Sequence, residues 1–222
     1  YRSLRLTGTE EVVDRLVDKS MNRSLAAGLY PDAPGSHQIF GNLRDDPENV
    51  FDRARPQAAV VAGLGEEGKL SARDLVYTVR QAVLAYAQRV ADQDADATRF
   101  EMAATLLGSG GTGITAGSAA QLIAQGALEA NLKLQDSRWP QLGHLMLVEL
   151  YLDRASEAWS ALHLREVATP NRLKLVGKVS SGPGALRRSL DSSYRGAAYD
   201  FISALTVDMS AERRCIAYKL DT

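Results

Sequence analysis

The sequence has few of the residues that mark disulfide-rich, metal-binding or membrane-spanning proteins. It has a single cysteine, Cys215, among 222 residues, so a disulfide within the chain is excluded and a cytoplasmic, reducing compartment is expected. The three histidines, His37, His144 and His163, are scattered without metal-ligand spacing, so no metal site is predicted. No apolar run approaches the roughly 18 residues that a membrane-spanning helix needs.

Neither sign of charge dominates. The chain carries 26 lysines and arginines against 27 aspartates and glutamates, a net charge of −1. This balance gives no bulk electrostatic argument for nucleic acid or for an anionic membrane as a partner. The first residues, Tyr1 to Leu4, include neither an initiator methionine nor the apolar stretch of a signal peptide, so we expect a segment of a longer protein.

The chain does contain an alternation of short apolar runs, glycine turns and amphipathic stretches. Each apolar run reads as a strand, and a helix is expected after it. The predicted strands are 58–62, 100–107 and 145–151. The helix after the first begins at the N-cap Ser71 and ends near Val90; the next is capped by Thr115 or Ser118 and ends near Leu132; the third begins at Asp153. This order predicts an α/β fold with a mainly parallel sheet.

The two ends of the chain read differently. The apolar spacing over 9–21 predicts one helix, and Ile39 and Phe40 open a short strand. Near the other end, alternating residues predict a strand over 172–179, a turn follows over 180–184, and 215–218 form a last strand. We therefore predict an α/β domain over residues 1–170, with residues 171–222 as an extension packed on the same domain.

The segment from Gly108 to Gly113 is the best candidate for a ligand or partner site. A glycine turn between a strand and a helix can bind phosphate through its backbone N–H groups and the helix dipole. It is not a Walker loop, because no Gly-Lys-Ser/Thr follows, and its glycine spacing does not fit a dinucleotide fingerprint. The alternative is that the glycines only permit a tight turn and close helix packing. The turn Gly63-Leu64-Gly65 is expected at the same carboxyl edge of the sheet, which favours binding there.

Other reactive residues have simpler explanations. Cys215, among Ile216 and Ala217, is expected to be a buried structural thiol. The adjacent carboxylates Glu66 and Glu67 on a loop are expected to be solvated rather than catalytic. No catalytic residue and no cofactor is therefore predicted.

The run from Met102 to Ile123 resembles the macro-domain pattern, in which a strand leads into a glycine-rich loop and a helix that begins with small residues. The resemblance implies a three-layer α/β/α fold. It gives the role of the loop that wraps the phosphates of ADP-ribose to Gly110, Gly111, Thr112, Gly113 and Ile114. The same fold forms the non-catalytic amino-terminal domain of leucine aminopeptidases, which implies a scaffold without a ligand. The adenine-side Asp and Asn of macro domains are not matched.

The order of motifs along the chain is similar to the region before the peptidase domain in some bacterial CHAT-domain proteins, which carry a caspase-like cysteine protease module. The segments that carry this resemblance are 28–31, 60–70, 108–113, 148–155 and 181–188. The protease's catalytic His and Cys are not matched, so the resemblance implies a non-catalytic accessory domain. Such a domain would be an interaction or regulatory scaffold for the rest of a larger polypeptide or a partner protein, in a defence role. The alternatives are binding of ADP-ribose or another nucleotide phosphate, and ADP-ribosyl hydrolysis.

Overall fold

The computed structural model describes residues 5–42, 56–109, 113–168, 172–176, 179, 180 and 182, together with the backbone of 201–208 and 215–221. The chain divides into two compact units, Tyr1–Leu186 and Arg187–Thr222. The packing of residues 171–222 on the first domain stays a prediction.

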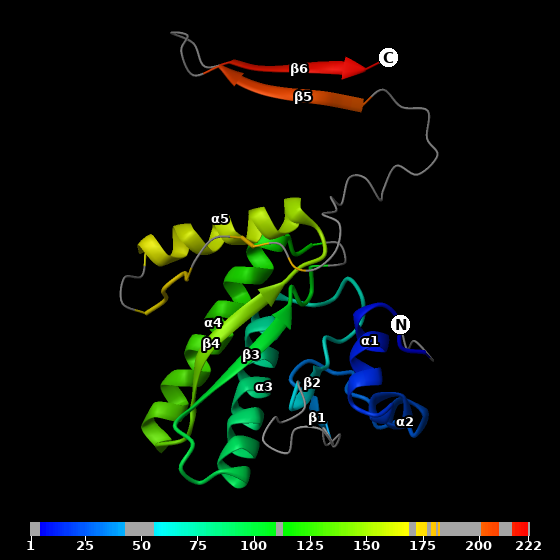
Figure 1. Cartoon of the computed structure of the whole chain (residues 1–222), viewed down its shortest axis with the longest axis vertical. Helices are drawn as coiled ribbons and strands as arrows, with labels where there is room; N and C mark the ends of the chain where they lie inside the picture. Colours follow the sequence, from blue (N-terminus) through cyan, green and yellow to red (C-terminus); the bar gives the residue numbers. More distant parts are fainter. Residues whose placement is uncertain are drawn as a thin grey trace, which may run out of the picture. The chain divides into compact units, whose positions relative to one another are not determined.

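The first unit contains five helices and four strands among its described residues (Figure 1). In chain order they are α1 (Thr9–Leu16), α2 (Ser20–Ala26), β1 (His37–Gly41), β2 (Ala58–Ala62), α3 (Ala72–Gln93), β3 (Arg99–Thr105), α4 (Ala116–Ser137), β4 (Gln141–Val148) and α5 (Leu152–Ala168). The second unit has an antiparallel pair, β5 (Phe201–Asp208) and β6 (Cys215–Asp221). The predicted mixed α/β class is confirmed.

The strands form three two-stranded sheets rather than one sheet. β3 and β4 are parallel, from Arg99 opposite Gln141 to Thr105 opposite Val148. β2 instead pairs antiparallel with β1, with His37 opposite Ala62. The prediction of a mainly parallel sheet is therefore wrong for the described residues. The apolar run of β2 suggested a parallel strand, but its partner precedes it in the chain, and an antiparallel pair needs no helical crossover.

Both long helices start where local chemistry predicts. The Ser71 hydroxyl accepts a hydrogen bond from the Asp74 backbone N–H at 3.1 Å, and the Asp74 carboxylate accepts one from the Ser71 backbone N–H at 3.4 Å, which completes a capping box. At α4, the choice between two caps falls on Thr115, whose hydroxyl accepts from the Ser118 N–H at 3.1 Å. Both helices run longer than expected, and α4 ends only where Arg138 adopts a left-handed conformation with φ 56°.

Other predicted boundaries are wrong. The helix expected over 9–21 is two helices, because Asp18 and Lys19 both have positive φ. The break lets Val17 and Met21 both bury against Phe40. The strand expected over 145–151 starts and ends earlier, after Pro140.

The strand expected over 172–179 is also wrong for its described residues. Residues 172–176 form no strand, and the Leu175 N–H donates instead to the Glu166 carboxylate of α5 at 2.9 Å. The backbone N–H and C=O groups of a strand form hydrogen bonds with a neighbouring strand. In this segment the Leu175 N–H is bonded to a side chain instead.

The core lies between the β3–β4 sheet and the helices α3 and α4. Leu75 and Val79 of α3, Ile123 of α4 and Phe100 of β3 are buried together in it. Gly126 of α4 brings the helices close, since a Cβ there would lie 2.8 Å from the Val76 carbonyl oxygen and from the Val79 Cβ.

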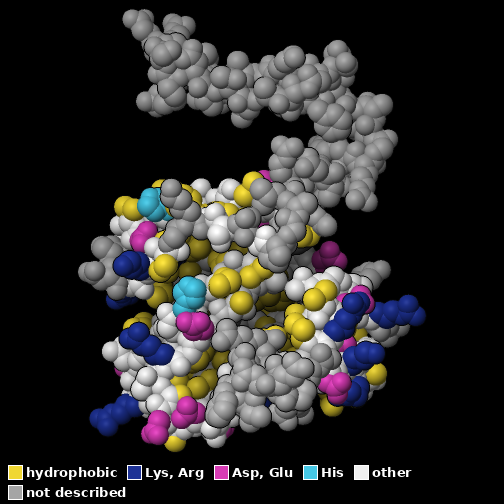
Figure 2. Space-filling view, viewed as in Figure 1, with side chains coloured by type: hydrophobic (Ala, Val, Ile, Leu, Met, Phe, Trp, Pro, Cys, Tyr) yellow, Lys and Arg dark blue, Asp and Glu magenta, His cyan; other side chains and the backbone are white. Residues whose placement is uncertain are grey.

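The opposite face of the β3–β4 sheet is exposed, and no described helix covers it. In Figure 1 the two strands cross in front of α3 and α4, and α5 packs on α4. Outward residues of β3 and β4 are exposed: Glu101, Ala103, Thr105, His144, Met146 and Val148. Figure 2 shows hydrophobic side chains among charged ones on this side of the molecule.

Candidate functional site

The Gly108 turn follows β3 and lies against the core. Gly108 has φ +77°, and a Cβ there would lie 2.6 Å from the Leu70 Cδ2 atom. Ile114, at the other end of the turn, packs on the cluster around Leu75. At Gly113, with φ +119°, a Cβ would meet no atom within 4 Å among the described residues. Both Gly108 and Ile114 are thus explained by packing, and of the two glycines of the turn that the structure describes, Gly113 is the one that borders open space.

The centre of the predicted phosphate loop, Gly110, Gly111 and Thr112, lies outside the described residues. Their predicted contact with phosphate stays a prediction.

The N–H groups of Gly63 and Gly65 donate hydrogen bonds to the loop at 32–36. The Gly63 N–H donates to the Ser36 carbonyl at 2.9 Å, and the Gly65 N–H donates to the Asp32 carbonyl at 2.7 Å. These are the N–H groups that would have to point at a phosphate. A Cβ on Gly63 would also overlap the backbone of that loop.

Thr78 connects the Gly63 turn and the 32–36 loop to α3. Its buried hydroxyl accepts from the Gly35 N–H at 2.7 Å and lies 3.4 Å from the Gly63 carbonyl oxygen, to which it donates. The Gly63 turn is therefore a three-way connection between β2, the 32–36 loop and α3.

The two glycine turns do not end strands of one sheet, so the expectation of a shared carboxyl edge is wrong. β2 pairs with β1 and β3 with β4, because each strand found a different partner. The turns do meet the same hydrophobic core. Leu64, beside Gly63, and Leu107, beside Gly108, both pack on the cluster that contains Leu75.

The amino terminus of α4 is met by a side chain of α5. The Glu157 carboxylate accepts a hydrogen bond from the Gly117 N–H at 2.9 Å. A Cβ on Gly117 would lie 3.1 Å from the Ala161 Cβ and 3.2 Å from Glu157 Oε1, so glycine permits this approach. The positive end of a helix dipole is where an anion would bind. Here a carboxylate of the same chain lies at that end.

An ion pair supports the base of the turn. Arg154 of α5 donates through Nε to the Glu149 carboxylate at 3.1 Å. Its Nη2 donates to the Ser109 hydroxyl at 2.5 Å and to the Ser109 carbonyl at 3.2 Å. Ser109 is buried, and its hydroxyl donates to the Leu106 carbonyl at 2.6 Å. Arg154, which contacts Ser109 of the glycine turn, therefore binds groups of the chain itself.

Sequence reasoning found only part of this arrangement. The positions of Glu149 and Arg154 around the start of α5 could suggest a pair. Ser109 and Glu157 carried no local signal, because their partners are 45 and 40 residues away in the chain.

The histidines lie on separate elements. His37 is on β1 and His144 on β4, whereas His163 stacks on Trp159 of α5 with ring centroids 5.3 Å apart. Within the described ranges, no cluster of three or more His, Cys, Asp or Glu side chains could hold a metal ion. None of the helices in these ranges combines the length and the hydrophobicity that crossing a lipid bilayer requires.

Two further candidates behave as structural or surface groups. Glu66 pairs with Lys69 at 2.5 Å on the exposed loop after β2. The Tyr30 hydroxyl donates to Glu10 at 3.0 Å. Burial, and then the Glu10 charge, raise the pKa of Tyr30 above its usual value, so this phenol keeps its proton at alkaline pH where a free tyrosine loses it. A protonated phenol held by a carboxylate is a structural contact.

No protein-family model matches the chain, and no curated protein matches it. The contacts around the glycine turns therefore carry the functional argument.

Proposed function

We propose that this chain is a non-catalytic accessory domain of a larger bacterial effector protein of the CHAT type, and that it acts as an interaction or regulatory scaffold. One observation carries the proposal: the N–H groups of Gly63, Gly65 and Gly117 already donate to acceptors within the chain. The order of strand, glycine turn and helix around the parallel pair β3–β4 supports the macro-domain-like part of the proposal.

A phosphate at the start of α4 would have to displace Glu157 or lie beside it. Displacement costs the carboxylate its hydrogen bond to Gly117. If the carboxylate stays, two negative groups lie within a few ångströms of each other, which disfavours the second anion. The nearby Arg154 offers little compensation, because it is paired with Glu149.

The exposed face of the β3–β4 sheet favours a scaffold. Parallel strands are usually covered on both faces. Here Met146 is 54% and Val148 49% exposed, and Leu150, just after β4, is 59% exposed. Apolar side chains gathered on one side of a sheet are typical of a contact surface.

The test is thermal unfolding of the whole chain with ADP-ribose, and separately with inorganic pyrophosphate, each over a concentration series. We expect no change in Tm with either compound. A ligand at one hundred times its Kd would stabilise the fold by about 2.7 kcal/mol, a readily measured shift. A saturable increase in Tm with ADP-ribose would overturn the scaffold proposal.

Nucleotide-phosphate binding at the Gly108–Gly113 turn is the second candidate function. It is favoured by the open space beside Gly113 and by the 22-residue helix that starts just after the turn. Under this alternative, ADP-ribose raises Tm, and Gly111→Glu removes the effect by placing a carboxylate in the loop. ADP-ribosyl hydrolysis would further require turnover of an ADP-ribosylated substrate by the chain.

A further inference from the structure

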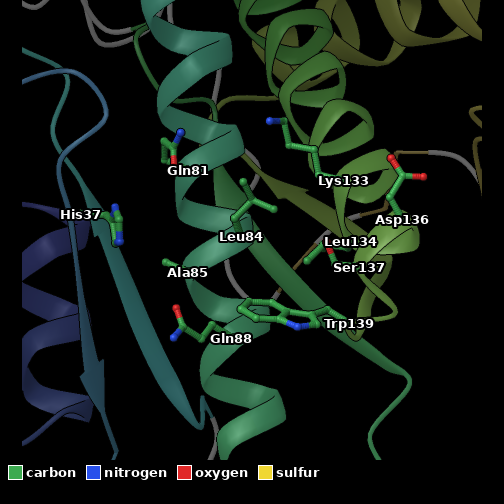
Figure 3. A pocket seen from close by; sticks show the side chains of 10 residues that line it. All are labelled: His37, Gln81, Leu84, Ala85, Gln88, Lys133, Leu134, Asp136, Ser137 and Trp139. Atoms are coloured by element: carbon green, nitrogen blue, oxygen red, sulfur yellow. The ribbon is translucent and has the colours of Figure 1, made fainter.

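A hollow of about 520 Å³ opens between α3 and α4. It adjoins the middle of α3 and the last turns of α4, whereas the glycine turns adjoin the first turns of these helices. Figure 3 shows its lining side chains, which come from β1, α3, α4 and the segment just after α4. Its volume lies in the range of about 300–1,000 Å³ that small-molecule sites occupy.

Lys133 and Asp136 are the two charged side chains that α4 contributes to the lining of this hollow. Figure 3 shows the Lys133 side chain extending from α4 toward α3, while Asp136 points away on the other side of α4. Among the described residues, Lys133 takes part in none of the ion pairs. The hollow therefore contains an ammonium group without a carboxylate partner in the described part of the chain.

Trp139 supplies an aromatic surface. It is 40% exposed, and its indole lies across one end of the hollow toward α3. The backbone N–H of Trp139 donates to the Leu134 carbonyl at 3.0 Å, which fixes the residue to the end of α4. Leu84 projects from α3 on the facing side. A flat ring would thus find an indole and an aliphatic wall already in place.

Polar groups border this apolar part. Gln81 and Gln88 are seven residues apart on α3, two turns along one face, and Leu84 lies between them. Their amides can both donate and accept hydrogen bonds. Lys133 is the one lysine or arginine among the described lining residues, so an anion in the hollow would have one ammonium group to bind.

We propose that this hollow binds a small aromatic anion, with its ring against Trp139 and Leu84 and its acidic group on Lys133. Neither Lys133 nor Trp139 belongs to the glycine turns, so the proposal is independent of the scaffold function. Stacking on an aromatic ring supplies affinity for the flat part. The exposed ammonium supplies a moderate preference for an anion over a neutral analogue.

The test is a ¹H–¹⁵N NMR titration of the whole chain with 2-naphthoate and with its neutral analogue 2-naphthamide. The chain has two tryptophans, so there are two indole N–H signals, and Trp139→Phe assigns them. We expect 2-naphthoate to shift the Trp139 signal saturably and leave the Trp159 signal in place. We expect 2-naphthamide to bind about three- to fivefold more weakly, as an exposed ion pair allows.

Two variants separate the charge from the ring. Lys133→Gln should weaken 2-naphthoate to the level of 2-naphthamide. Trp139→Ala lacks the indole reporter, so its binding is followed through the backbone amide signals, and it should weaken both compounds by up to about tenfold. Lys69→Gln, at an exposed lysine elsewhere, should change neither. The backbone spectrum of each variant shows whether it is folded. A Trp139 signal that does not move at millimolar 2-naphthoate would overturn the proposal, as would an unchanged anion preference in folded Lys133→Gln.

Discussion

The contact between Glu157 and the start of α4 makes a quantitative prediction. The Glu157 carboxylate accepts from the Gly117 N–H at 2.9 Å. Two effects stabilise the fold there: the hydrogen bond, about 0.5–1.5 kcal/mol, and the attraction of the negative charge to the helix dipole, about 0.3–1 kcal/mol. Because Glu157 is an exposed residue, both belong near the lower end of their ranges.

Two substitutions remove these effects one after the other. Glu157→Gln keeps an oxygen acceptor and loses the charge, so we expect a loss of about 0.5 kcal/mol in the free energy of unfolding. Glu157→Ala loses both, so we expect about 1 kcal/mol. Only the charge effect should shrink at high salt, since screening weakens the attraction to the dipole.

Urea unfolding followed by circular dichroism at 222 nm, at low and high salt, measures these differences. Glu67→Gln removes a charge from the exposed loop after β2 and should stay within about 0.5 kcal/mol of the wild type. If Glu157→Ala unfolds at the same urea concentration as Glu67→Gln, the carboxylate does not stabilise α4, and the argument against a bound phosphate loses its main support.

Substitutions at three further positions test the packing and capping that position the turns, each by the same urea measurement. Gly126→Ala should destabilise by about 1 kcal/mol despite its better helix propensity, because its Cβ would lie 2.8 Å from the Val76 carbonyl oxygen of α3; a gain in stability would contradict this. Thr78→Val should cost about 1–3 kcal/mol, because the Gly35 N–H loses its acceptor; a neutral effect would show that this contact between α3 and the 32–36 loop does not stabilise the fold. Ser71→Ala should cost about 1 kcal/mol through loss of the N-cap, and Ser71→Thr, which keeps the hydroxyl, should restore most of it.

Local chemistry explains which parts of the fold could be predicted. Ser71 and Thr115 cap their helices with hydroxyl groups three residues from the N–H groups they accept, and such a spacing is visible in a sequence. The break at Asp18 and Lys19 has no glycine or proline to mark it. It follows from burying Val17 and Met21 against Phe40, a strand residue far along the chain.

The sheets show the same limit on a larger scale. The apolar run 58–62 was correctly predicted to be a strand, but its composition could not say whether 37–41 or 99–105 would pair with it. Glycine turns carry a related ambiguity. Gly63 and Gly117 are required by close contacts with the 32–36 loop and with α5, and a sequence shows the glycine without showing the neighbour.

The glycines around α4 distinguish a loop that binds phosphate from one that resembles it. A binding loop must leave N–H groups and a positive helix end open to the ligand. In this chain α5 brings Glu157 to the Gly117 N–H and Arg154 to Ser109, 45 residues back along the chain. Around the start of α5 the charges alternate in sign, from Glu149 through Arg154 to Glu157, and each of these side chains binds a group of the chain itself. The same contacts that could have held a ligand thus fasten α5 to α4, which leaves the exposed β3–β4 face as the better surface for a partner.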